Sequence, residues 1–141
     1  MKTLVIGLIG YSFFYEFDHL PTIGESLLTK EMTKEIGGKG FNQAYTIQML
    51  GGDVKFISTI GDDEFKNIII NDLNKTSLNN NIIYKQGQNT IASIMSYKDS
   101  NNVFVSKGVE LLIDDFDLIK KEIDNADIIL LTNEIDDELL R

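Results

Sequence analysis

Three short apolar runs, separated by stretches with helical spacing, constrain the fold of this chain more than any other feature. Runs this apolar are typical of strands that are buried on both faces of a sheet. They cover residues 3–9, 54–60 and 126–131, and apolar side chains recur at helical spacing between them, in residues 44–50, 65–73 and 116–123. Strands that alternate with helices in this way predict an α/β fold with a largely parallel sheet.

Two other stretches do not follow this alternation. Residues 13–36 mix aromatic and polar side chains around a turn at Pro21, and residues 91–97 and 103–105 have the pattern of a hairpin with a long polar turn. They predict a second, smaller sheet. A last helix is expected from Asp136, a few residues before the chain stops at Arg141. Because a parallel sheet needs helices on both faces, we expect the chain to be a truncated piece of a larger fold.

The composition limits the classes of function. Of the 141 residues 43% are apolar and 25% are charged, as in ordinary soluble globular proteins. The net charge of −9 and a single arginine, Arg141, argue against nucleic-acid binding. The chain has no cysteine and one histidine, His19, which excludes disulfides, thiolate zinc sites and histidine-rich metal sites. No apolar stretch approaches the roughly 20 residues of a membrane span, so we expect a cytoplasmic protein without membrane contact.

A glycine-rich turn before the first expected helix is the most informative segment for function. It reads Gly37-Gly38-Lys39-Gly40-Phe41-Asn42. Glycines let the backbone approach a ligand closely, and the following helix start presents unpaired amides. The turn is not a P-loop, because Lys39 is not followed by Ser or Thr, and it does not directly follow the first strand as a dinucleotide fingerprint would. A ligand-facing turn is favoured over a plain tight turn before a helix, which stays the alternative.

This block, Gly-Gly-Lys-Gly-x-Asn-Gln-Ala, resembles the N-terminal signature of the ribokinase-like, phosphofructokinase-B family of carbohydrate kinases. Three further segments agree: Leu20-Pro21 with Gly24-Glu25, Gly61-Asp62-Asp63-Glu64-Phe65 after a core strand, and Asn133-Glu134 after the third apolar run. Lys66 stands where the second of these segments usually has a glycine. The resemblance runs from residue 3 to 141 and covers about the first half of the family's length.

The resemblance implies an ATP-dependent kinase that phosphorylates a hydroxymethyl group of a sugar or related polyol, with ATP and Mg²⁺ as cofactors. It also implies a ribokinase-like core in residues 3–12 and 37–141. Residues 13–36 and 90–107 would form a β-clasp, a lid over the sugar that also makes a homodimer interface. The substrate-binding residues that it implies are Gly10, Ser12, Gly38, Lys39, Gly40, Asn42 and Glu134.

Two departures from the family pattern qualify this implication. The family usually has Asn-x-Asp where this chain has Gly10-Tyr11-Ser12, and a serine cannot act as a charged double acceptor. The family's Gly-Ala-Gly-Asp segment, which carries the base aspartate and most of the ATP site, has no counterpart in these 141 residues. The resemblance therefore gives no catalytic residue here, and the chain alone is expected to be inactive. The alternative function is a non-catalytic sugar-binding or dimerising module.

Other polar residues invite a functional interpretation that we set aside. Asp62 and Asp63 could be a metal pair, but a cap for the following helix is the better interpretation. The acidic residues Glu134, Asp136, Asp137 and Glu138 are interpreted as a helix start rather than a metal cage. His19 is expected to be a solvated residue or part of the lid. We therefore predict no metal site within this chain.

Overall fold

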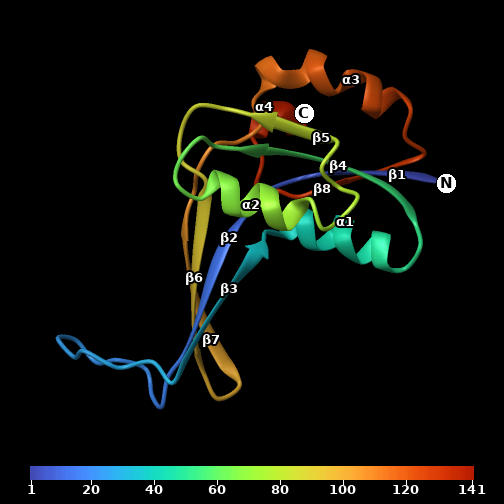
Figure 1. Cartoon of the computed structure of the whole chain (residues 1–141). Coiled ribbons are helices and arrows are strands. Elements are labelled where there is room, and N and C mark those ends of the chain that lie inside the picture. The colour runs from blue at the N-terminus through green and yellow to red at the C-terminus, as the bar shows by residue number, and fades with distance from the viewer.

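The computed structural model describes residues 1–141 and contains two four-stranded sheets (Figure 1). Sheet A has the strand order β5-β4-β1-β8, and all three of its strand pairs are parallel. Its strands are β1 (Lys2–Ile6), β4 (Asp53–Ile60), β5 (Asn81–Tyr84) and β8 (Ile128–Leu131). The helices are α1 (Lys39–Met49), α2 (Lys66–Leu73), α3 (Phe116–Asp124) and α4 (Asp137–Leu140), with a 3₁₀ turn at Ile113–Asp115. The predicted α/β fold with a parallel sheet is confirmed.

The hydrophobic core lies on both faces of sheet A. Successive side chains of a strand point to opposite faces, so Val5 and Phe56 pack on one side and Leu4 and Ile57 on the other. The first side includes residues of α1 and α2, and the second is covered by Ile119 of α3 and by residues of the segments around it. This explains why β1 and β4 are continuous apolar runs rather than alternating ones.

Sheet B extends away from this body, and the loop of residues 17–30 lies at its far end (Figure 1). Its order is β3-β2-β6-β7, and its strands are β2 (Gly10–Glu16), β3 (Glu31–Gly37), β6 (Thr90–Tyr97) and β7 (Ser100–Ser106). Strands β2 and β6 run parallel, whereas the two outer pairs are antiparallel. The expected second sheet is therefore present.

The first predicted strand was too long. β1 ends at Ile6, and the chain enters β2 of the other sheet at Gly10, so sheet B begins three residues before the expected Phe13. Ile9 lies between the strands and is still only 2% exposed, because it packs in the core beneath α1. The apolar run correctly predicted that Ile9 is buried. A residue beyond the end of a strand can be buried without taking part in the hydrogen bonding of the sheet.

Two further local predictions differ from the structure. Strand β5 was not predicted: it begins at Asn81, in the asparagine cluster of residues 79–81, and completes sheet A. The hairpin turn is shorter than predicted, since Tyr97 pairs with Ser100 and only Lys98 and Asp99 connect the strands. Lys98 adopts a positive φ of 50°, which such a tight connection requires. In both cases the pairing with a neighbouring strand, and not the polarity of the segment itself, determines where the strand begins.

The capping role expected of Asp62 and Asp63 was wrong. Helix α2 begins after Phe65, and no side chain caps it. Asp62 Oδ1 instead accepts a hydrogen bond of 2.7 Å from the Gly87 amide, and Asp63 Oδ2 accepts one of 2.7 Å from the Asn89 amide. The two carboxylates thus bind the turn that leads into β6 and connect the end of sheet A to the start of sheet B.

Candidate functional site

A cavity of about 430 Å³ lies where the two sheets meet, beside the start of helix α1. One face of sheet B forms most of its wall, through residues that alternate along each strand and face one another in the register. These residues are Gly10, Ser12 and Phe14 of β2, Glu35 and Gly37 of β3, Thr90, Ala92 and Ile94 of β6, and Val103 and Val105 of β7. The rest of the wall includes Leu8, Gly38, Lys39, Asn42 and Glu134.

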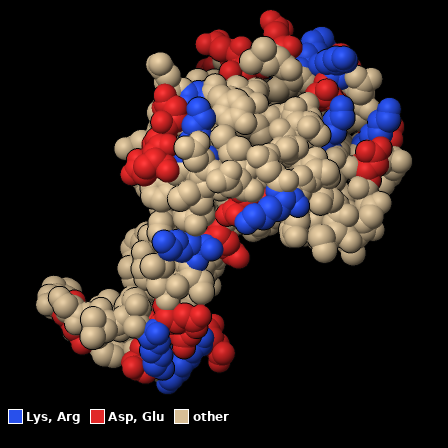
Figure 2. All heavy atoms as spheres, viewed as in Figure 1, with Lys and Arg blue, Asp and Glu red and all other residues tan.

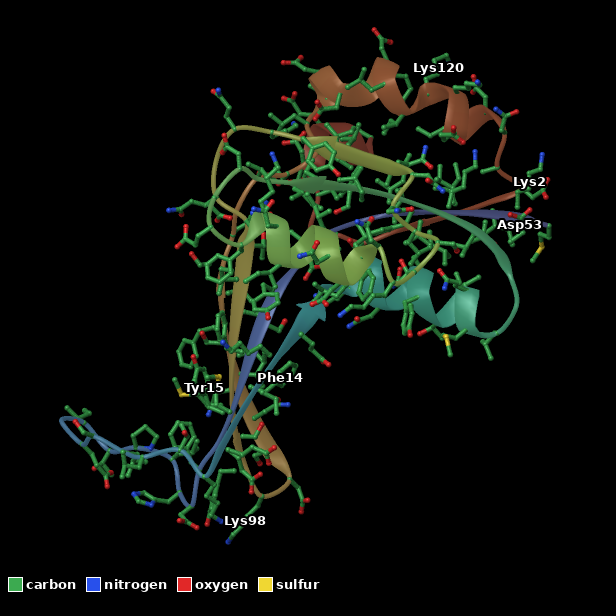
Figure 3. The ribbon with its side chains drawn as sticks, viewed as in Figure 1. Lys2, Phe14, Tyr15, Asp53, Lys98 and Lys120 are labelled. Atoms are coloured by element: carbon green, nitrogen blue, oxygen red, sulfur yellow. The ribbon has the colours of Figure 1, made fainter.

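The opposite face of sheet B is held against the body near its base. Tyr11 and Phe13 on this face lie with their ring centroids 5.8 and 6.0 Å from that of Phe65. Figure 3 shows the alternation farther along β2, where Phe14 and Tyr15 project to opposite sides of the strand and Lys98 marks the tip of the sheet. Phe14, on the cavity face, has no such support. The aromatic contacts therefore fix the base of the sheet while its cavity face stays free.

Glycines allow helix α1 to begin directly against the chain segment that follows β1. Gly38 has a φ of 104°, and a Cβ there would lie 2.4 Å from the carbonyl oxygen of Leu8. A Cβ on Gly40 would lie 2.6 to 2.7 Å from backbone atoms of Gly7. No side chain caps the first turn of α1 and no acidic residue occupies it. The helix therefore presents the positive end of its dipole at the cavity.

Lys39 and Glu134 meet across the mouth of this cavity, 95 residues apart in the chain. Lys39 Nζ donates to Glu134 Oε1 at 2.8 Å. The side chain of Lys39 is 67% exposed and that of Glu134 is 31% exposed, so the ion pair itself adds little stability. The second carboxylate oxygen, Glu134 Oε2, is buried and has no hydrogen-bond partner.

The structure brings six of the seven predicted site residues to this cavity. They are Gly10, Ser12, Gly38, Lys39, Asn42 and Glu134. Gly40 does not line it. It is buried in the contact between α1 and the end of β1, which explains the glycine by packing. Glu35 and the apolar residues of β6 and β7 were not foreseen, because their place in the wall depends on how the strands of sheet B pair.

The remaining candidates lie elsewhere. His19 is in the exposed loop between β2 and β3, where its Nε2 lies 2.8 Å from Glu25 Oε1. Asp63 keeps its charge for a structural reason: although burial alone would raise its pKa, hydrogen bonds from Asn89 and the Phe65 amide hold the pKa below its usual range. No group of three or more His, Cys, Asp or Glu side chains has the geometry of a metal site.

The family model described as "pfkB family carbohydrate kinase" matches residues 2–140. The chain therefore belongs to the pfkB family of carbohydrate kinases. It is 27% identical to a ribokinase of Bacillus subtilis over 95% of this chain and 47% of that protein. The solved ribokinase of Thermotoga maritima, at 26% identity, superposes with a TM-score of 0.83 over 99% of this chain and 47% of its own.

A ribokinase of Arabidopsis thaliana solved with ribose and ATP is 25% identical, with a TM-score of 0.73 over 98% of this chain and 47% of its own. The chain thus spans about half the length of the relatives that it matches. No helix is long and apolar enough to cross a membrane. On the face shown in Figure 2, Lys and Arg side chains are interspersed with Asp and Glu and form no large positive patch.

Proposed function

We propose that the cavity between the two sheets binds a small sugar or related polyol, as the sugar-binding half of an ATP-dependent carbohydrate kinase that phosphorylates a hydroxymethyl group. The observation that carries the proposal is that Lys39, Asn42 and Glu134 line one cavity beside the uncapped start of α1. Sugar hydroxyls both donate and accept hydrogen bonds, so they match this mixture of donors and acceptors. The family relationship and the relative bound to ribose support the same class of ligand.

Each polar residue of the cavity has a distinct part in this proposal. Glu134 accepts from one hydroxyl, while Lys39 and Asn42 donate to sugar oxygens. Gly38 lies in the cavity wall at the uncapped start of α1, whose free amides are donors for sugar oxygens. Ser12, which is 7% exposed, exchanges a single hydrogen bond with the sugar from β2. Gly10 lines the cavity and lets β2 lie close to β6, because a Cβ there would be 2.5 Å from the carbonyl oxygen of Thr90.

The cavity face of sheet B would act as a lid over the sugar. Residues 13–36 and 90–107 form this clasp, and residues 3–12 and 37–141 form the core that supports it. Phe14, Ile94, Val103 and Val105 give the lid an apolar inner surface. A lid of this kind excludes water, which would otherwise compete with the sugar hydroxyl for the phosphoryl group.

ATP as phosphoryl donor is supported by the relative solved with ATP, and Mg²⁺ belongs to the same proposal. We assign neither group to residues of this chain. They contain no cluster of three metal-ligating side chains, and the glycine turn lacks the Ser or Thr that follows the lysine of a P-loop. We therefore assign no catalytic residue here. We expect the 141-residue polypeptide alone to show no sugar-dependent release of ADP.

Isothermal titration of the chain with D-ribose tests the proposed site. Asn42→Ala removes a donor at the cavity and is expected to weaken binding about tenfold. Asn101→Ala, at the exposed far end of sheet B, is the matched control and should leave the affinity unchanged. Absence of heat on addition of D-ribose to the unaltered chain, or equal affinities for the two variants, would contradict the proposed site.

A specific observation favours dimerisation through the clasp, whether the module is part of a kinase or the non-catalytic alternative. The outer strand β7 is exposed along its whole length, and Val103, Phe104 and Val105 are 54 to 60% exposed. An apolar edge strand of this kind is a surface on which a second copy can pack. We propose a homodimer that covers β7. Sedimentation should show a dimer for the unaltered chain and a monomer for Phe104→Lys, because Phe104 is exposed on β7 but does not line the cavity.

A further inference from the structure

Glu35 lies on the cavity face of sheet B, directly across from Ser12. The antiparallel register of β2 and β3 pairs these two residues, and both line the cavity. Residues that face each other in such a pair have Cβ atoms about 4.5–5.5 Å apart and share one side of the sheet. A ligand group that reaches the Ser12 hydroxyl therefore also reaches the Glu35 carboxylate.

Glu35 is the free charge of this cavity. The charged side chains in its wall are Lys39, Glu134 and Glu35. Lys39 is already bound to Glu134, and Glu35 takes part in none of the eight ion pairs of the chain. With two carboxylates and one ammonium group, the wall carries a net negative charge. The neighbours of Glu35 on this face are apolar or small, so the carboxylate has no local cation to neutralise it.

We propose that Glu35 is the specificity-determining residue of this site, selecting neutral polyols and rejecting sugar acids and sugar phosphates. A carboxylate accepts hydrogen bonds at two oxygens and so fits two neighbouring hydroxyls of a sugar. It repels the carboxylate or phosphate of an anionic sugar in the same position. The charged acceptor at this end of the cavity is thus supplied by β3, because β2 offers only the single hydroxyl of Ser12. This inference rests on the proposed sugar site.

The test compares D-ribose with D-ribonate, the sugar acid of the same carbon number, by ligand-observed NMR titration. Glu35→Gln keeps the size of the side chain and removes its charge. Charge-assisted hydrogen bonds are roughly twice as strong as neutral ones, so this variant is expected to bind D-ribose about fivefold more weakly. It is also expected to bind D-ribonate more tightly than the unaltered chain. Opposite changes for the two ligands cannot come from a loss of folding.

Glu31→Gln is the matched control, because Glu31 is on the same face of β3 but lies outside this cavity. It should leave both affinities unchanged. If Glu35→Gln leaves both affinities unchanged while Asn42→Ala still weakens D-ribose binding, the role of Glu35 is wrong and the sugar site stands. If the unaltered chain does not bind D-ribose, the sugar site is wrong and the role of Glu35 falls with it. Equal effects of the two glutamate variants would also overturn the role of Glu35.

Discussion

In sheet A the central strands β1 and β4 are buried on both faces, whereas in sheet B the outer strand β7 is exposed along its whole length. Burial of apolar side chains is the main source of stability, so sheet A holds most of the free energy of folding. Sheet B is held at its base by aromatic contacts with Phe65 and has little covering beyond them. Segments with few buried contacts open at low cost. We infer that sheet A is the more rigid part of the molecule and that sheet B opens more easily, with the candidate site between the two sheets.

The largest expected effect is a difference in the free energy of unfolding between one substitution in sheet A and one in sheet B. Phe56→Ala in β4 removes a side chain that is 1% exposed and should lower the free energy of unfolding by about 3–5 kcal/mol. Met32→Ala in β3 removes one that is 46% exposed and should change it by less than about 0.5 kcal/mol. Urea denaturation measures both values. Similar losses for the two variants would show that the sheets are equally important for stability.

A smaller effect is expected at the contact between α1 and the end of β1. Gly40→Ala places a methyl group against the backbone of Gly7 and should cost about 1–3 kcal/mol, the range for overpacking. The same shift should move Lys39 and Asn42 and weaken D-ribose binding. Gln43→Ala, at an exposed position of the same helix, is the control and should affect neither property. Unchanged stability in Gly40→Ala would mean that this close approach does not position the site.

The smallest effect is expected at the joint between the sheets. The lowered pKa of Asp63 means that its ionised form is favoured by folding, so its contribution is present above about pH 3.9, the usual value for Asp, and is lost as the pH falls through the folded-state value. Asp63→Asn should therefore lower the free energy of unfolding at pH 7 by about 1 kcal/mol. The difference from the unaltered chain should vanish at low pH.

Denaturation curves at pH 7 and at pH 3 and below check this prediction. Glu64→Gln changes a neighbouring exposed carboxylate and serves as the control, with no expected effect at either pH. A difference between Asp63→Asn and the unaltered chain that stays constant down to low pH would assign the contribution of Asp63 to something other than its charge.

Much of sheet A could be predicted from the sequence because its core strands are buried on both faces. Continuous apolar runs marked the approximate positions of β1, β4 and β8, but the end of β1 and the start of β8 were misplaced. The expected burial of β8 on both faces was wrong, because β8 is an edge strand of sheet A and three of its four residues are exposed. Strand β5 was missed because it begins in an asparagine cluster and depends on its pairing with β4. Asp63 has the sequence signature of a helix cap, but besides the nearby Phe65 amide it binds Asn89, 26 residues away. Local patterns do not report such long-range partners.

The residues of the candidate site likewise fall into those that the sequence predicted and those that it did not. Lys39, Asn42 and Glu134 lie at a glycine turn and after a strand end, and the family motif marked them, so sequence reasoning found them. Glu35 was not found because its β-strand is too polar for the periodicity to show which face is inside. Only the register with β2 places it beside Ser12. The residues fixed by sheet A were thus predictable, and those contributed by sheet B required the structure.

Chemical-shift mapping of bound D-ribose tests most directly whether the site lies between the two sheets. Amide resonances of an ¹⁵N-labelled chain are followed as the sugar is added. We expect shifts both at the start of α1, at Gly38 and Asn42, and on the cavity face of sheet B, at Ser12 and Ala92. Residues of the opposite end of sheet A, such as Lys2 and Asp53 (Figure 3), should not shift. Shifts confined to one sheet, or centred away from this cavity, would contradict it.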